Sequence, residues 1–244
     1  MIASPREIWV YLAASPLLNL TLTLAAYLVG DYLFRKSGQK PFFNPVLIAI
    51  VILVSMLLAT GTSYETYFEG AQFVHFLLGP ATVALAVPLY RQFERVRHSG
   101  WAILISLLVG SITAVLSAVL ITWLFGAPQN VVASIAPKSA TTPIAMGISE
   151  QIDGLPSLTA VLVILTGILG AMFGTNILGW IGVRDGSAQG FALGLASHGI
   201  GTARALQVSE VAGAFSALAM GLNGLATSLL VPLLFHLLRG WLWP

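Results

Sequence analysis

The sequence predicts an all-α, polytopic integral membrane protein. Of its 244 residues, 57% are hydrophobic and only 8% are charged, whereas charged residues make up about 25% of an ordinary soluble domain. Apolar segments run from Ile8 to the C-terminus with only short breaks, and a membrane-spanning helix needs about 20 mostly apolar residues. Lipid therefore surrounds most of this chain, and we expect one transmembrane domain over residues 1–244.

Three apolar segments without Asp, Glu, Lys or Arg precede residue 91. The first covers residues 8–30, and Pro16 predicts that its helix begins inside this range, because proline is tolerated in the first turn of a helix. The second covers residues 41–64. The third covers residues 70–90 and is interrupted by the pair Gly79-Pro80. Each is long enough to be a crossing.

The next uncharged stretch, residues 99–137, is too long for one crossing, and the sequence GAPQ at 126–129 predicts the turn. The chain that follows carries Pro137, Lys138 and Pro143 together with several hydroxyls. A straight lipid-facing helix does not tolerate this composition, because every backbone polar group in lipid needs a partner. A re-entrant hairpin over residues 130–150 would place Arg184 on the cytoplasmic side, so the positive-inside rule favours it, but the sequence does not settle which interrupted segments are re-entrant.

Three further segments complete the chain. Residues 154–183 predict a clean crossing, residues 186–203 are glycine-rich, and residues 211–238 predict a final long crossing. The total is about seven to eight transmembrane segments, some of them broken or re-entrant. A weak echo of residues 81–92 in residues 140–151 is consistent with an inverted repeat, as in many transporters, and also with chance in an Ala-rich chain.

Charge and composition exclude several classes of protein. The net charge is +2 and the basic residues are scattered at the ends of apolar runs, so nucleic acid is not an expected partner. Short basic loops, at Arg35-Lys36 and at 91–97, are expected on the cytoplasmic side. Cysteine is absent and no His/Glu pair has metal-ligand spacing. We expect no metal, no cofactor and no disulfide.

Enzymatic activity is not expected either. Ser197 and His198 are catalytic residue types, but neighbours on a helix point about 100° apart and cannot form a dyad with each other. His75 or His236 would have to supply the base. We therefore assign no catalytic residue.

Two interrupted segments predict a cavity, because non-helical chain at membrane depth survives only where protein or water surrounds it. The first contains Lys138 among hydroxyls, and Pro143 breaks helical hydrogen bonding. The second places Arg204 near glycines that permit close backbone approach or a positive φ. Together they favour a small carboxylate anion. The candidate substrate-binding residues are Lys138, Ser139, Thr141, Thr142, Pro143, Ser197, His198, Gly199, Gly201, Thr202 and Arg204.

Each of these residues also has a plainer interpretation. Lys138 could extend to a membrane interface, Arg204 could pair with Glu210, and His198 could be a packing residue or a proton carrier. Asn223, deep in the last span, is typical of contacts between helices. Small residues at Gly167, Gly170 and Gly174 let helices approach closely, within one chain or in a homodimer, which we expect.

Residues 137–171, PKSATTPIAMGISEQIDGLPSLTAVLVILTGILGA, and residues 194–225, GLASHGIGTARALQVSEVAGAFSALAMGLNGL, closely resemble the CidB/LrgB family. Weaker similarity at 76–90 and the overall hydropathy extend the resemblance over nearly the whole chain. This chain has Asp153 at a loop position where glycine is more common in the family.

The resemblance implies a multi-pass protein of the bacterial inner (cytoplasmic) membrane, paired with a smaller membrane protein of the CidA/LrgA type. It implies a holin- or antiholin-like role in murein hydrolase control and cell lysis. Similar proteins are also linked to the movement of small carboxylates such as pyruvate, and a plant plastid relative to glycolate and glycerate.

Our first hypothesis is a transporter of small carboxylate anions, with or without a coupled proton. The alternative is a holin- or antiholin-like pore component or regulator, and a third is a structural membrane partner. Substrate, coupling ion, direction and oligomeric state are not set by the sequence.

Overall fold

The computed structural model describes residues 16–243, and these form helices, turns and loops without a strand. The described chain divides into two compact units, one ending at Ala84 and one beginning at Leu85. The part of the first predicted span before Pro16 lies outside the described residues.

The first unit is a small helical cluster. Helix α2 (Pro16–Lys36) packs against α3 (Pro45–Thr60) and α4 (Tyr64–Phe76), and α5 (Leu78–Ala84) follows. A short 3-10 turn, η1 (Pro41–Phe43), precedes α3. Asn44 caps α3 by accepting from the backbone N–H groups of Val46 and Leu47. At about 24 Å, the 16 residues of α3 are shorter than the roughly 30 Å hydrocarbon core.

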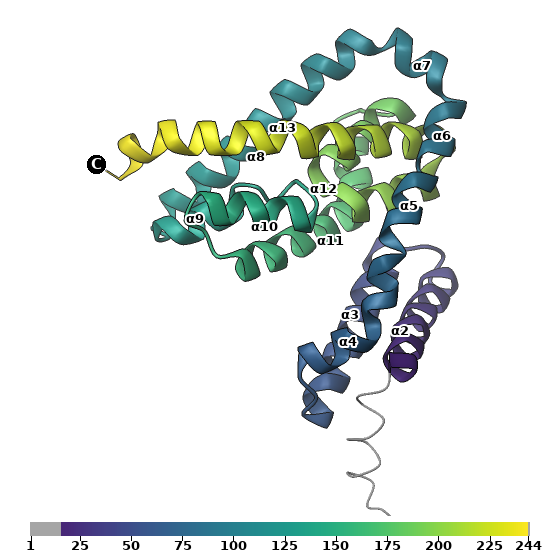
Figure 1. Ribbon diagram of the computed structural model, residues 1–244. Helices are drawn as coiled ribbons and strands as arrows, with labels where there is room; N and C mark the ends of the chain where they lie inside the picture. The colour runs from purple at the N-terminus through teal and green to yellow at the C-terminus, as the bar shows by residue number, and fades with distance from the viewer. Residues whose placement is uncertain (1–15, 244) are drawn as a thin grey trace, which may run out of the picture. The chain divides into compact units, whose positions relative to one another are not determined.

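The second unit is built on three long helices. After the short helices α6 (Ala86–Arg91) and α7 (Phe93–His98) come α8 (Gly100–Leu124), α11 (Pro156–Trp180) and α13 (Glu210–Leu242). Helices α8 and α11 are both 25 residues long, which is enough to cross the hydrocarbon core. A helical hairpin follows α8 and another follows α11, so a long helix followed by a hairpin occurs twice along the chain (Figure 1).

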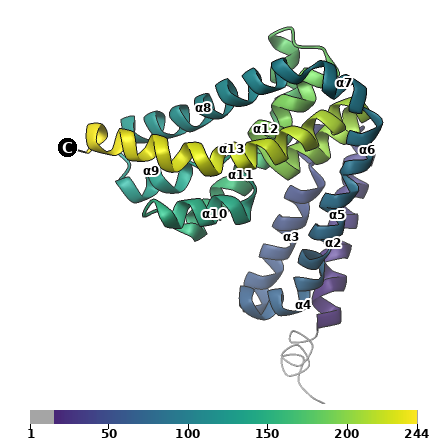
Figure 2. The same cartoon turned by 45° about the horizontal axis from the view of Figure 1, so that its top comes forward.

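Hairpin 1 consists of α9 (Gln129–Ile135), a non-helical tip at 136–141, and α10 (Thr142–Gln151). Its two arms lie side by side, because the Thr159 hydroxyl of α11 lies within hydrogen-bond distance of both the Ser134 carbonyl of α9 (3.0 Å) and Ser149 Oγ of α10 (2.7 Å). Figures 1 and 2 both show α9 and α10 beside α11. The hairpin expected over residues 130–150 is therefore present, and the turn before it lies where predicted, at Gly126.

Hairpin 2 is α12 (Gly186–Val208), which reverses direction at His198. His198 has φ 43° and ψ −133°, a conformation that no helix contains. Beyond it the chain returns along itself: a methyl group at Gly201 would lie 2.5 Å from the Leu193 carbonyl oxygen. The open ends also meet, since a Cβ on Gly186 would lie 3.4 Å from Ser209 Oγ. Residues 186–203 are therefore not one crossing.

The first arm of hairpin 2, residues 186–197, packs backbone to backbone on α13. A Cβ at Gly190 would collide with the Ala212 carbonyl, and one at Gly194 with the Ser216 carbonyl. The absence of a side chain therefore sets the spacing between the arm and α13. The same arm also contacts α8, where the absence of a side chain at Gly110 leaves room for the Leu195 side chain.

Four described helices are long and apolar enough to cross a membrane: Leu17–Lys36, Gly100–Leu124, Pro156–Trp180 and Glu210–Leu242. The bent pair Tyr64–Val74 and Gly79–Arg91 is a fifth candidate if it forms one span. Leucine, valine and phenylalanine side chains are exposed along these helices, as lipid-facing surfaces require. The chain is thus a helical membrane protein, and residues 16–243 do not confirm the predicted count of seven to eight segments. The repeat also differs from the predicted pairing: residues 81–92 form parts of α5 and α6 and no hairpin.

Candidate functional site

The tips of the two hairpins meet at Asn223, in the middle of α13. The Asn223 side chain, 1% exposed, donates to the Ser139 carbonyl of hairpin 1 (3.0 Å) and to the Leu195 carbonyl of hairpin 2 (3.1 Å). Its own oxygen accepts from Ser111 Oγ of α8 (2.7 Å). One buried amide therefore joins α8, α13 and both hairpin tips.

Hairpins 1 and 2 approach this point from opposite ends of α11. The base of hairpin 1 contacts Thr159, near the start of α11, whereas hairpin 2 begins just beyond the C-terminal end of α11. The tips reach the same level, because Ala140 packs on Val163 and the His198 ring bonds to the Val163 carbonyl. This level is about 10 Å from the first residue of α11 at 1.5 Å per residue.

Lys138 lies at the tip of hairpin 1 and faces a cavity of about 500 Å³ between α11 and the first arm of hairpin 2. Its ammonium group donates to Ser139 Oγ (3.3 Å). No carboxylate in the described part of the chain forms an ion pair with it. An intramembrane cation without a counter-ion favours an anionic ligand, because an unpaired charge in low dielectric is costly.

Ser197 lines the same cavity from hairpin 2. It packs directly on Gly170 of α11, where a side chain would collide with the Ser197 hydroxyl. Thr166 of α11 is the third polar side chain in the cavity, and its hydroxyl donates to the Leu162 carbonyl (2.7 Å). The Thr166 hydroxyl still has lone pairs that can accept a hydrogen bond from a ligand. The Ser197 hydroxyl can donate one.

His198 shapes the tip of hairpin 2. Its Nε2 lies 2.9 Å from the Val163 carbonyl, so this nitrogen carries the proton in the bond. Gly167 of α11 makes room for the ring, because a Cβ there would lie 2.7 Å from His198 Cε1. The hydrogen bond and the close packing hold a positive φ that costs a non-glycine residue free energy.

The remaining predicted residues surround this centre in different ways. Thr202 is buried and bonds to the His198 carbonyl (2.9 Å) and to Ser216 Oγ (3.0 Å). Thr141, Thr142 and Pro143 form the start of α10, and Gly199 and Gly201 open the second arm of hairpin 2. None of these residues is among those that line the Lys138 cavity.

Arg204 lies apart from Lys138. It does not line the cavity, and its guanidinium donates to Gln207 Oε1 (3.1 Å), three residues along the same arm. Glu210, the alternative partner considered for Arg204, accepts instead from Arg91 (3.5 Å). The cavity that Lys138 lines is therefore not shared with Arg204, because Arg204 follows the reversal at His198 and lies on the arm that returns toward the base of hairpin 2.

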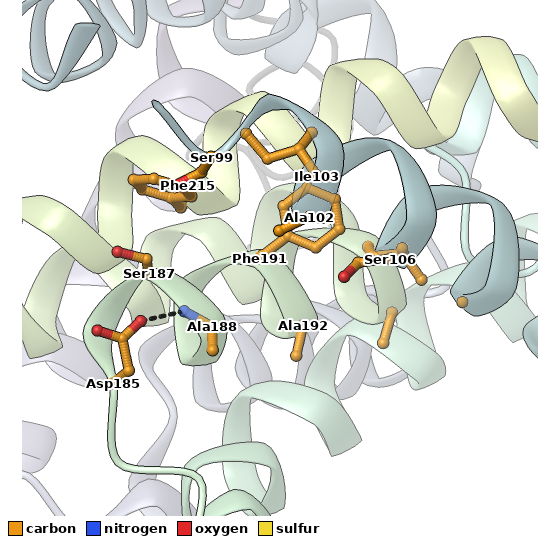
Figure 3. A pocket seen from close by; sticks show the side chains of 13 residues that line it. Ser99, Ala102, Ile103, Ser106, Asp185, Ser187, Ala188, Phe191, Ala192 and Phe215 are labelled. Carbon is orange, nitrogen blue, oxygen red and sulfur yellow. Dashed lines mark hydrogen bonds between the residues drawn. The ribbon is translucent and has the colours of Figure 1, made fainter. Parts of the chain in front are cut away.

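A second cavity, of about 480 Å³, lies between the start of α8 and the first arm of hairpin 2 (Figure 3). Its wall is mostly apolar, with Ile103, Phe191 and Phe215. The charged residue in its lining is Asp185, which caps the arm by accepting from the Ala188 N–H (2.9 Å). It offers no cation to an anion. Within residues 16–243, no three His, Asp or Glu side chains gather as a metal site.

Sequence reasoning missed the contribution of α11 to the cavity wall. The sequence of α11 predicts a uniform apolar crossing, with no sign that part of it lines a cavity. Its residues in the cavity wall include Thr166, Leu169, Phe173 and Ile177. The available signal was the spacing of Gly167, Gly170 and Gly174, which face His198, Ser197 and Leu193 of hairpin 2.

Comparison with known proteins covers almost the whole chain. The sequence model described as the LrgB-like family matches residues 23–237. The chain is 38% identical over 228 residues to "Uncharacterized protein YxaC" of Bacillus subtilis (strain 168), covering 92% of this chain and 99% of that protein. It is 33% identical over 219 residues to "Antiholin-like protein LrgB" of Bacillus cereus (strain B4264), covering 90% and 95%. No solved structure matches.

Proposed function

Because the chain belongs to the LrgB-like family, we propose that it acts in the cytoplasmic membrane as an antiholin-like protein that restrains murein hydrolase activity and lysis. The observation that carries this proposal is the similarity to antiholin-like LrgB over 90% of the chain. Such a role needs a protein that stays in the bilayer, which the long apolar helices provide.

The test is an autolysis assay in a bacterial strain from which the LrgB-family genes have been removed. Expression of the chain is expected to slow detergent-induced lysis and to lower murein hydrolase activity in the culture. As a control, a variant that is not inserted in the membrane should restore neither. Equal lysis with and without the correctly inserted chain would contradict the proposal.

The hairpins supply the proposed membrane arrangement. Both are re-entrant in this proposal: they enter from opposite faces, and their tips meet in the membrane interior. This is the geometry of transporters built from inverted repeats, in which broken helices form the binding site. Non-helical chain at the tip of hairpin 1 is tolerated there because protein surrounds it.

A second function, transport of a small carboxylate anion such as pyruvate or glycolate, is favoured by one specific observation. Lys138 is a half-buried cation at a hairpin tip, faces a cavity of ligand size and forms no ion pair with a described carboxylate. A bound carboxylate would neutralise the Lys138 ammonium group and accept a hydrogen bond from Ser197. A proton is a candidate coupling ion.

Uptake of labelled pyruvate and glycolate into proteoliposomes tests this second function. Saturable uptake that is lost in Lys138→Ala and kept in Lys40→Ala, a change of an exposed lysine, would support it. Unsaturable leakage of unrelated solutes, indifferent to Lys138→Ala, would contradict it and support a pore.

The proposal includes two partners besides the lipid bilayer. One is a small membrane protein of the CidA/LrgA type, and the other is a second copy of this chain. Co-purification of tagged proteins after co-expression tests the first, and the mass of the detergent-solubilised protein tests the homodimer. A monomer that binds no such protein would contradict both.

A further inference from the structure

We propose that the groove between α8 and the first arm of hairpin 2 binds one acyl chain of an anionic phospholipid, whose phosphate group lies on arginines at the mouth of the groove. This groove is the second cavity described above. It lies on the α8 side of the arm, whereas the Lys138 cavity lies on the α11 side. The inference depends on neither of the two functions proposed above.

The groove has a mouth and a closed end, because α8 and the first arm run in the same direction beside each other. Ser99 at the start of α8 lines one end together with Asp185 and Ser187 at the start of the arm (Figure 3). At the other end Leu195 packs on Gly110. Both helices begin at the same end of the unit, so the groove enters the membrane interior from a membrane surface.

The groove is too narrow for a helix and wide enough for a single hydrocarbon chain. From Ser99 to Gly110 it extends about 16 Å at 1.5 Å per residue. A volume of about 480 Å³ over that length leaves a mean cross-section of about 30 Å². An α-helix with its side chains is about 10–12 Å across, which is roughly 80–110 Å². A helix of a second copy therefore does not fit inside, whereas an extended acyl chain does.

The interior of the groove suits an acyl chain. Its floor is made of three buried apolar side chains, Phe191, Leu195 and Phe215. Small, exposed residues leave its side open to lipid: Ala102, Ser106, Ala188 and Ala196. A phospholipid needs this opening, because its second chain stays in the bilayer. Apolar contact by itself gives little preference in a membrane, since lipid chains are as apolar as the groove, so the headgroup has to supply it.

The cations lie just outside the mouth. Arg97 precedes the lining residue Ser99 by two positions, and Arg184 directly precedes Asp185. Helix α7 is held against the groove, since Val96 packs on the apolar cluster that contains the floor residues. Arg97 and Arg184 are exposed, and within residues 16–243 neither forms an ion pair with a carboxylate. Two free guanidinium groups can therefore bind a phosphate.

Acidic residues at this end do not cancel the arginines. Asp185 accepts from the Ala188 N–H (2.9 Å), Glu210 accepts from Arg91 (3.5 Å), and Glu94 is exposed on α7. Four arginines lie at the same end: Arg91, Arg95, Arg97 and Arg184. This excess places the mouth at the cytoplasmic surface by the positive-inside rule. Each arginine near an anionic lipid surface raises affinity about fivefold.

The experiment is native mass spectrometry of the detergent-solubilised protein, titrated with dioleoyl phosphatidylglycerol and dioleoyl phosphatidylcholine, which have the same chains. Phosphatidylglycerol should bind about 25-fold more tightly, because two arginines contribute about fivefold each. The double variant Arg97→Gln/Arg184→Gln should lose this preference. Arg239→Gln, a change of an exposed arginine at the far end of α13, should keep it.

A second pair of variants tests the position of the acyl chain. Ser106→Phe should fill the groove and weaken phosphatidylglycerol binding at least tenfold. Leu108→Phe, at an exposed position of α8 outside the lining, should leave binding unchanged. Ala102→Leu, nearer the mouth, replaces Ser106→Phe if that variant does not fold.

Four results would overturn the inference. Equal affinity for the two lipids would mean that the groove does not select an anionic headgroup, and a preference kept in the double variant would exclude Arg97 and Arg184. Displacement of phosphatidylglycerol by glycerol phosphate, which has no chain, would assign the arginines to a free phosphate. A dimer that dissociates in Ser106→Phe, with lipid binding unchanged, would assign the groove to a second copy of the chain.

Discussion

Replacement of Asn223 by alanine should destabilise the second unit more than any other single polar change at the hairpin tips. The substitution removes both donors that bind the Ser139 and Leu195 carbonyls and the acceptor for Ser111. Hydrogen bonds between membrane helices contribute about 0.6 kcal/mol each on average, and a buried group left without a partner costs about 1–3 kcal/mol. Three bonds with partial relaxation therefore give a loss of about 2–4 kcal/mol.

Reversible unfolding in mixed micelles, followed by circular dichroism, measures this loss. Ser111→Ala removes one of the three bonds and leaves the buried Asn223 oxygen without its donor, so it should cost about 1–2 kcal/mol, less than Asn223→Ala. Ser228→Ala is the control on α13, because its exposed hydroxyl bonds only to the Leu225 carbonyl of its own helix (2.7 Å), and it should change stability by less than about 0.5 kcal/mol. If Asn223→Ala costs no more than Ser111→Ala, the amide does not join the hairpin tips.

Two further substitutions test packing and the loop before α11, in the same unfolding assay. Gly194→Ala should lower the free energy of unfolding by several kcal/mol, because the added methyl group collides with the Ser216 carbonyl of α13. The control Gly221→Ala, with open space at its Cβ, should leave stability unchanged or raise it by up to about 1 kcal/mol. Equal effects of the two substitutions would contradict close packing of the arm on α13. Asp153→Gly should change the free energy of unfolding by less than about 1 kcal/mol. Glycine removes the backbone strain of a φ of 62°, and this gain offsets the loss of the exposed ion pair with Arg239 at 3.3 Å. A larger loss of stability would mean that this ion pair contributes more than an exposed pair usually does.

The positions where the chain breaks could largely be predicted from the sequence. Pro137, Lys138 and Pro143 indicate the non-helical tip of hairpin 1, because proline cannot continue a helix and a lysine is costly against lipid. Asp153 has a φ of 62°, a conformation that glycine adopts without strain, which agrees with the glycine that the family resemblance implies at this position.

The reversal of hairpin 2 could not be predicted in the same way. The glycines near it were expected to supply either close approach or a positive φ, and Gly194 and Gly201 supply only close approach. The positive φ falls on His198, where the bond to the Val163 carbonyl and the space at Gly167 hold it. Those contacts come from a helix 35 residues away in sequence, so no local pattern reports them.

The candidate site could be predicted only in part, for the same reason. Lys138 and Ser197 were both chosen from sequence, and the structure places both on one cavity. Arg204 was chosen because Arg binds carboxylates well, but its place after the reversal directs it to Gln207. Which arm of a hairpin a residue occupies depends on tertiary contacts, and spacing along the chain does not encode it.

The thermal stability of the purified protein with and without pyruvate tests the Lys138 site most directly. A ligand that binds only the folded state at 100 times its dissociation constant stabilises it by about 2.7 kcal/mol. Pyruvate is predicted to raise the unfolding temperature of the wild type and of the exposed control Lys40→Met, and to leave that of Lys138→Met unchanged. An equal rise in Lys138→Met, or no rise with any monocarboxylate, would contradict an anion site at the meeting point of the two hairpin tips.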